Sequence, residues 1–377
     1  MKKLLANKNI LFTCIGFFWI FLGFSGAQQY LFPLFKIQGK GDLALISLII
    51  LYSSFLASGF FAPKAINSLG LKRSLILGTL TYLLFVVSVV LNITFLFMLA
   101  SILVGAGASL LWVSSGKIIT DSSTMKASGK NLGIQLASVL IGSLLGVTFG
   151  GLFLKTLSPD KLYMFFSLAI LIGIPFLFLV KIKNKTVKDS VHNVTYLFDR
   201  KLIFIFPVIF ASYFLSAQTF SSMNEVILSK FGISSIGIFS PLLYISTVTG
   251  ALTIGKLSDI YDKKIVLYAL MSLGVMGSII FISSSLFLWV IIGTIILGFY
   301  ISGTYPVALS LIRANLNEKE YIYGIGAFQI YSNTGTVIAL FSALNFPTVN
   351  IFIAGISFLL LAFPAFYLYN KNYSLSR

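Results

Sequence analysis

Apolar and polar residues alternate along this chain in long blocks. The apolar blocks run to about 20 residues, the length at which a helix crosses the hydrocarbon core of a membrane. Short segments rich in charge, glycine or proline separate them. The pattern predicts twelve membrane-spanning helices, at about 10–35, 43–62, 73–91, 94–116, 131–154, 161–181, 202–227, 235–256, 265–283, 286–312, 321–345 and 348–369.

Composition supports a membrane protein. Hydrophobic residues make up 58% of the chain and charged residues only 10%, too few to cover a soluble protein of this size. The first apolar block, after Met1-Lys2-Lys3, has features of a secretory signal and also of a first membrane helix. Because eleven more apolar blocks follow, we expect an uncleaved helix and an all-α integral membrane fold.

The distribution of basic residues predicts the orientation. With a cytoplasmic N-terminus, 22 of the 27 Lys and Arg residues fall on the inner side, where membrane proteins hold them in excess. These clusters lie between apolar blocks and not on one face of a soluble fold, so the net charge of +17 does not indicate nucleic-acid binding. We therefore predict a multi-pass protein of the cell membrane with both termini cytoplasmic.

The two halves of the chain repeat one plan. The longest polar stretch, from Lys181 to Lys201, separates six apolar blocks from six. Gln28 in the sequence GAQQY matches Gln218 in SAQTF, 190 residues later, and Gln135 matches Gln329, 194 residues later. This register indicates duplication. It predicts two six-helix bundles, at 1–182 and 201–377, joined by a cytoplasmic linker at 183–200.

The loop after the second block of each half carries a shared motif. In the first half the motif is GFFAPK at 59–64, followed by LGLKR at 69–73; in the second half it is GKLSDIYDKK at 255–264. The pattern resembles the loop signature of the major facilitator superfamily, with Pro63 in place of the usual aspartate. The resemblance implies a loop that controls conformational change, formed by Gly59, Lys64, Gly70, Lys72, Arg73, Gly255, Asp259, Lys263 and Lys264. Each loop alone also fits a plain cytoplasmic turn rich in positive charge.

A second motif points to one branch of that superfamily. Residues 105–116, GAGASLLWVSSG, resemble the fourth helix of the "uncoordinated" group, and Trp112 stands where many proton-driven members carry an arginine. The superfamily resemblance implies a secondary transporter that moves a small solute by alternating access through a central cavity. The branch resemblance leaves an alternative, a non-transporting regulatory subunit of another membrane protein.

The superfamily fold implies that helices 1, 4, 7 and 10 line the cavity and bind substrate. The side chains predicted for this site are Gln28, Gln29, Trp112, Gln218, Thr219, Glu225, Tyr300 and Tyr305. In a bilayer such amides and hydroxyls serve equally well as contacts between helices, and Glu225 also fits the outer interface. Because the other side chains are neutral, we expect an uncharged, amphiphilic or mildly cationic substrate. We also expect a coupling proton or cation and a monomeric protein.

Little in the sequence suggests catalysis. Cys14 and His192 are the only residues of their kinds, and no paired carboxylates lie in the apolar blocks. We therefore expect no enzyme, no metal site and no cofactor. Gly142, Gly146 and Gly150 follow one another at four-residue spacing, which predicts a helix face that packs closely against a neighbour.

Overall fold

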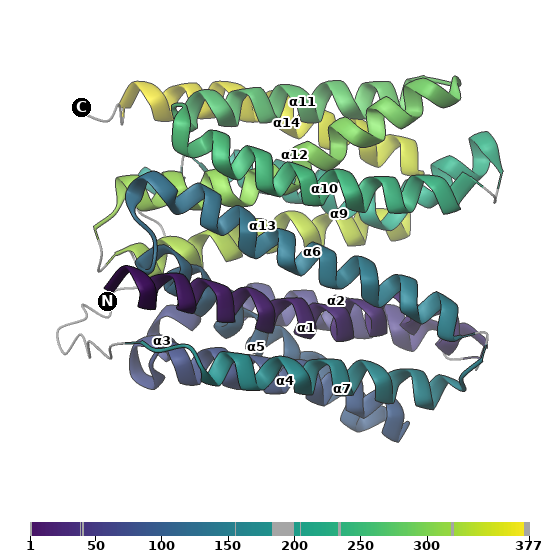
Figure 1. Cartoon of the computed structure of the whole chain (residues 1–377). Helices are drawn as coiled ribbons and strands as arrows, with labels where there is room; N and C mark the ends of the chain where they lie inside the picture. Colours follow the sequence, from purple (N-terminus) through teal and green to yellow (C-terminus); the bar gives the residue numbers. More distant parts are fainter. Residues whose placement is uncertain are drawn as a thin grey trace. The chain divides into compact units, whose positions relative to one another are not determined.

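The computed structural model describes residues 2–37, 39, 41–154, 156–182, 200–203, 205–232, 235–317 and 320–372. Within these residues all regular secondary structure is helical (Figure 1). A chain that crosses a membrane must satisfy its backbone hydrogen bonds internally, and helices do so within each segment. The predicted all-α class is confirmed.

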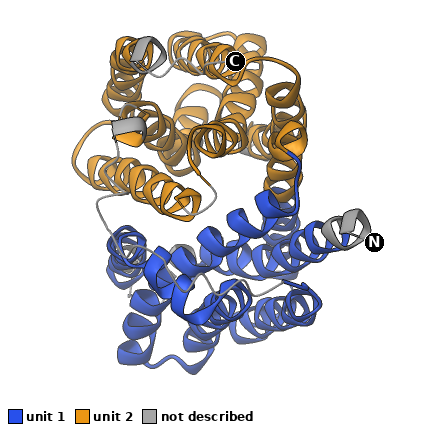
Figure 2. Ribbon diagram, turned by 90° about the vertical axis from the view of Figure 1, so that its left-hand side faces the viewer, with its two compact units in different colours: residues 1–124, 138–192 blue, residues 125–137, 193–377 orange. Residues whose placement is uncertain are grey.

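The chain divides into two compact units (Figure 2). Unit 1 comprises residues 1–124 and 138–192, and unit 2 comprises residues 125–137 and 193–377. Helix α6, Ser128–Phe153, therefore begins in unit 2 and continues in unit 1. Most of the linker predicted at 183–200 lies outside the described residues.

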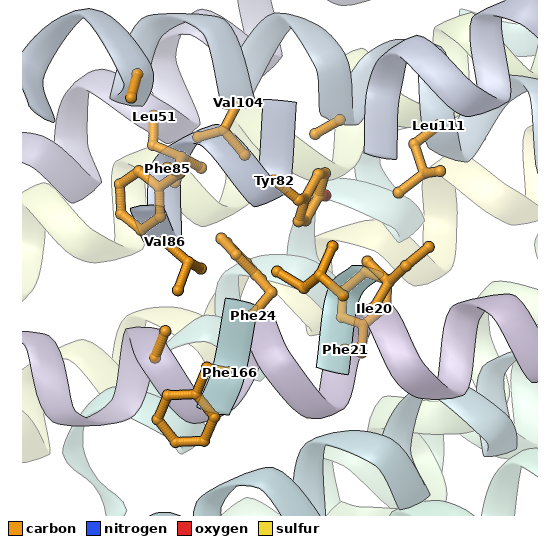
Figure 3. Close-up of a cluster of buried hydrophobic side chains, with 14 of the residues drawn as sticks. Ile20, Phe21, Phe24, Leu51, Tyr82, Phe85, Val86, Val104, Leu111 and Phe166 are labelled. Atoms are coloured by element: carbon orange, nitrogen blue, oxygen red, sulfur yellow. The ribbon is translucent and has the colours of Figure 1, made fainter. Parts of the chain in front are cut away.

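Unit 1 is a bundle built around aromatic side chains. Its other helices are α1 (Lys2–Ile37), α2 (Gly41–Gly59), α3 (Ala62–Leu69), α4 (Leu71–Leu91), α5 (Thr94–Asp121) and α7 (Pro159–Phe178). Helix α4 packs against α5 and α7, and α1 packs against α2 and α7. Figure 3 shows Phe24, Tyr82 and Phe85 in the core that these helices share. Interlocking rings stabilise such a bundle through van der Waals packing, since burial from lipid gives little hydrophobic gain.

Unit 2 holds the remaining helices. They are α8 (Arg200–Ile203), α9 (Phe206–Phe231), α10 (Ile236–Ile260), α11 (Lys263–Ser283), α12 (Phe287–Asn315), α13 (Tyr321–Asn345) and α14 (Thr348–Asn372). Helix α12 packs between α10 and α11, and α9 packs along α13 and α14. A short 3-10 turn, Met125–Ala127, precedes α6 in the same unit.

Ten of the described helices are long and apolar enough to cross a membrane: α1, α2, α4, α5, α6, α7, α10, α11, α12 and α14. Two of the twelve predicted segments correspond instead to α9 and α13. These helices have 26 and 25 residues, which is long enough, but they carry more polar side chains. The count of twelve spans stays a prediction, as does the cytoplasmic position of the termini.

Helix α1 begins at Lys2 and not near residue 10, and the seventh predicted segment also begins at a different residue. The apolar run at 202–227 predicts a single helix, whereas α8 ends at Ile203 and α9 runs from Phe206 to Phe231. Pro207 lies in the first turn of α9. Proline lacks a backbone N–H and is favoured at a helix start, which explains the later beginning.

The glycine face of α6 packs closely against α1, as predicted. A Cβ atom at Gly142 would overlap the carbonyl oxygen of Phe18, and one at Gly146 would overlap that of Leu22. At Gly150 the space is filled by the ring of Tyr30. Any larger residue would push these two backbones apart, so the stripe serves helix packing inside unit 1.

Candidate functional site

The predicted site residues of unit 1 belong to an aromatic cluster. The amide of Gln28 on α1 donates to the hydroxyl of Tyr52 on α2 at 3.2 Å. Trp112 on α5 packs against the rings of Phe17 and Phe21, with centroids 5.5 and 5.4 Å away and edge-to-face geometry. The hydroxyl of Tyr82 forms a hydrogen bond with the Trp112 side chain.

The predicted site residues of this cluster differ in their exposure. Gln28 and Trp112 are half-buried, and Gln29 is exposed. The ring faces near Trp112 are occupied by other ring edges, so the cluster is a packed wall and not an empty aromatic cage. The side chains that stay accessible in this cluster include those of Gln28, Gln29 and Trp112.

In unit 2 the predicted residues are more deeply buried. Gln218 on α9 has 0% of its surface exposed, and neither its Nε2 nor its Oε1 atom has a hydrogen-bond partner among the described residues. The hydroxyl of the adjacent Thr219 donates to the Leu215 carbonyl of the same helix at 2.8 Å. An amide buried without any partner costs several times the free energy that an ordinary hydrogen bond contributes. Gln218 is thus the least satisfied of the predicted site residues.

The two predicted tyrosines of α12 have different surroundings. Tyr300 is fully buried, and its hydroxyl faces that of Ser212 on α9 without a hydrogen bond of ordinary length. The hydroxyl of Tyr305 donates to Gln135 on α6 at 3.4 Å, a long bond. The ring of Tyr305 packs edge-to-face on Phe328 of α13, with centroids 5.7 Å apart. These contacts bring α6, α12 and α13 together inside unit 2.

Glu225 lies apart from these side chains. It is exposed near the C-terminal end of α9, and its carboxylate accepts a hydrogen bond from Thr348 at the start of α14. An exposed carboxylate that is held by the first residue of a neighbouring helix fits the outer-interface interpretation. Its role in coupling stays a prediction.

The loop motif of unit 2 holds the start of α6. The carboxylate of Asp259 accepts from the backbone N–H groups of Gly129 at 2.9 Å and Lys130 at 2.7 Å. These groups belong to the first turn of α6, where N–H groups lack partners within the helix and a negative charge is favoured. A Cβ on Gly255 would come within 2.7 Å of the Gly129 carbonyl oxygen, so glycine permits this close approach of α10 and α6.

Two basic residues of that motif, Lys263 and Lys264, are the first residues of α11. Lys263 is half-buried and Lys264 is buried. The backbone N–H of Lys264 donates to Asp262 at 2.8 Å, which makes Asp262 the N-cap of its own helix. The two aspartates of this motif, one in α10 and one in the turn that follows, therefore hold the starts of two different helices.

The equivalent loop of unit 1 makes other contacts. Pro63 is buried in the first turn of α3, where Asp259 would have its counterpart. Gly70 adopts a φ of 85°, which favours glycine, and separates α3 from α4. The ammonium of Lys72 donates to the carbonyl of Phe178 at the end of α7, at 2.7 Å. Gly59 is buried, while Lys64 and Arg73 are exposed.

Sequence reasoning missed several side chains that complete these contacts. Tyr52, Tyr82 and Ser212 sit beside predicted residues but carry no signal of their own in the sequence. Gln135 could have been found, because it belongs to a repeated motif. Lys117 forms an ion pair with Asp121 at 2.6 Å near the end of α5, and the sequence marked it only as a positive charge of the inner side. Over the described residues no group of three or more His, Cys, Asp or Glu side chains could hold a metal ion.

The fold is that of known membrane transporters. The crystal structure of the human organic anion transporter MFSD10 (TETRAN) superposes with a TM-score of 0.77, covering 96% of this chain and 99% of that chain. The two sequences are 14% identical, so this likeness shows the fold alone.

Sequence relatives agree with the predicted branch. The UNC93-like protein MFSD11 of Xenopus tropicalis is 33% identical over 152 residues, which cover 39% of this chain and 33% of that protein. Unc-93 of Caenorhabditis elegans, whose name describes a potassium channel regulatory protein, is 33% identical over 129 residues, 34% of this chain and 17% of that protein. The matches thus span about a third or less of the length of these relatives.

A family model settles the wider relationship. The Major Facilitator Superfamily model matches residues 10–338 and, in a second match, residues 205–376. Together with the helical fold and the UNC93-like relatives, these matches confirm the resemblance noted in the loop motifs and in residues 105–116. The chain belongs to the Major Facilitator Superfamily, a family of membrane transporters.

Proposed function

We propose that this protein is a secondary transporter that moves a small solute by alternating access of one site to the two sides of the membrane. Family membership and the repeated plan of the two halves support the proposal. It also includes the cell membrane as the location, cytoplasmic termini, a monomeric state and the domain limits at 182 and 201.

The contact between Asp259 and the first turn of α6 is the observation on which the proposal chiefly rests. It joins the last turn of α10 to the start of α6, a helix whose later residues belong to the other unit. A contact of this kind can form in one conformation and break in another, because it consists of two hydrogen bonds and a charge at a helix end. We propose that it stabilises one of the two states of the transport cycle.

The proposed substrate is uncharged, amphiphilic or mildly cationic. The side chains assigned to binding it are Gln28, Gln29, Trp112, Gln218, Thr219, Glu225, Tyr300 and Tyr305. Apart from Glu225 they are amides, hydroxyls and aromatic rings, which suit hydrogen-bonding and apolar groups better than an anion. Glu225 is the carboxylate through which a proton or cation would be coupled.

Flux measurements test this function. We expect purified protein in proteoliposomes to take up at least one solute of a labelled neutral and cationic panel, driven by a proton or sodium gradient. For that solute, Asp259→Asn should change the initial rate about fivefold, because weakening a charge at a helix end by about 1 kcal/mol shifts a two-state ratio by that factor.

Asp262→Asn is the matched control. Asp262 caps α11 within its own unit, and asparagine is an equally good cap, so the control should transport at the wild-type rate. Equal rates for wild type and both variants would remove the Asp259 contact from the transport cycle. Uptake that depends on an anionic solute would contradict the substrate class.

The similarity to unc-93 of Caenorhabditis elegans favours a second candidate, regulation of another membrane protein without transport. Exposed apolar side chains on α7 and α14, such as Leu168 and Leu361, offer surfaces for such a partner. A partner that copurifies in a fixed ratio, together with no flux by the isolated protein, would favour this candidate over transport.

A further inference from the structure

Lys230 makes an unusual set of contacts at the end of α9. Its ammonium group donates to three main-chain carbonyl oxygens, those of Phe281 at 2.9 Å, Ile282 at 2.6 Å and Ser284 at 2.8 Å. All three belong to the C-terminal end of α11 or the residue that follows it. One side chain of unit 2 thus uses its three N–H donors on the end of a neighbouring helix.

The end of α11 needs such a partner. The last four carbonyl groups of a helix have no N–H partner within it, and they carry the negative end of the helix dipole. Because Lys230 lies one residue before the end of α9, the negative ends of two helices meet here. A single positive charge between them offsets the repulsion of both dipoles.

The three carbonyl oxygens suit one type of cation better than others. Calcium binds oxygen at about 2.3–2.6 Å and magnesium at about 2.0–2.1 Å, whereas the three carbonyl oxygens lie 2.6–2.9 Å from the ammonium nitrogen. The three oxygen atoms that face the cation belong to neutral carbonyl groups, whereas divalent ions favour carboxylates. Carbonyl oxygens that replace a hydration shell are typical of sites for potassium. The set therefore suits a monovalent ion or a primary ammonium group.

We propose that the carbonyls of Phe281, Ile282 and Ser284 form a monovalent-cation site, which the ammonium group of Lys230 fills as a tethered ion. The site accounts for a basic residue on the predicted outer side of the membrane, where few occur. Removal of the tether leaves a site that a free primary ammonium or alkali ion can occupy.

Cation rescue of a truncated variant tests the site. Lys230→Ala, purified in detergent, should unfold about 1–3 °C below the wild type, because the charge at the helix ends is lost. Methylammonium chloride should restore at least half of this loss in a saturable manner, since a ligand of the folded state stabilises it by mass action. Potassium chloride should restore a smaller part. Choline chloride at equal ionic strength should restore none, because its quaternary nitrogen has no N–H and is bulky.

Lys230→Met is the matched control. Methionine fills most of the same path without a charge, so this variant should lose stability and should not respond to methylammonium. Equal shifts in methylammonium and choline, or equal rescue of the Met and Ala variants, would overturn the proposal. If Lys230→Ala yields no folded protein in choline, its recovery in methylammonium becomes the readout, and failure to recover there also overturns the proposal.

Discussion

Gln28 and Gln218 hold equivalent positions in the two units, but they are used differently. Gln28 is half-buried and donates to Tyr52, whereas Gln218 is fully buried and neither polar atom of its amide has a partner within the described residues. Burying an amide without a hydrogen-bond partner costs free energy. We infer that Gln218 finds its partner in another state of the protein or in the substrate.

The loop motifs of the two units also make different contacts. Asp259 of unit 2 holds the first turn of α6, while its counterpart in unit 1 is Pro63, which has no charge and starts α3. The basic Lys72 of the unit 1 loop instead binds the end of α7 in its own unit. The two motifs also differ in shape, because α3 lies between α2 and α4 in unit 1, whereas α11 follows two residues after α10 in unit 2. The contact with the first turn of α6 belongs to the motif of unit 2.

We expect the largest effect on stability from substitutions in α6, because this helix packs through glycine in both units. A Cβ at Gly146 would overlap the Leu22 carbonyl oxygen in unit 1, and one at Gly133 would overlap the Ala251 carbonyl oxygen in unit 2. We expect Gly146→Ala to lower the free energy of unfolding by about 3 kcal/mol, since a backbone cannot move aside easily. Thermal unfolding in detergent measures this loss.

Gly133→Ala should behave differently if the contact of α6 with unit 2 opens during transport. The protein can then avoid the clash by populating the other state, so stability should fall by less than about half as much while flux is impaired. Gly151→Ala is the comparison on the same helix, because its Cβ would meet only side-chain atoms of Tyr30, the nearest of them the hydroxyl at 2.8 Å, and no backbone atom. Equal stability losses at Gly133 and Gly146 would show that both contacts are permanent.

The sequence predicts most helix ends but not all of them. Hydropathy and loop charges mark where a helix leaves the membrane, so most helix ends lie within a few residues of their predicted places. The start of α9 differed because Pro207 acts through backbone geometry and leaves hydropathy almost unchanged. The glycine stripe of α6 was predictable because its spacing repeats within one helix.

Partners between helices were beyond the sequence. Nothing in the sequence pairs Lys230 with the end of α11 or Gln28 with Tyr52, since each contact joins segments that only the fold brings together. The repeat and the family resemblance named the candidate site residues, and their role in binding a substrate stays a prediction. The sequence does not distinguish Gln28, whose amide has a hydrogen-bond partner, from Gln218, whose amide is buried without one, because the difference depends on the fold.

The second test concerns those two amides. Gln218→Leu should raise the free energy of unfolding by about 1–3 kcal/mol, because it removes a buried amide with no partner and keeps an apolar side chain of similar size. Gln28→Leu should lower it by about 1 kcal/mol, since the Tyr52 hydroxyl would lose its partner. Thermal unfolding of both variants measures the effect, and flux of Gln218→Leu should be impaired despite its greater stability. A destabilised Gln218→Leu would show that the amide is satisfied after all.

The smallest expected effect compares two lysines that bind helix C-termini. Lys72 donates to one carbonyl, that of Phe178 at the end of α7, whereas Lys230 donates to three. Lys72→Met should therefore lower the free energy of unfolding by less than about 1 kcal/mol, the usual range for a cation in the last turn of a helix. Lys64 lies in the neighbouring helix α3 and is exposed, so Lys64→Met serves as a control with no measurable change in thermal unfolding. A loss at Lys72 as large as that at Lys230 would mean that stability depends on the charge alone, and that the number of carbonyls bound does not distinguish the two units.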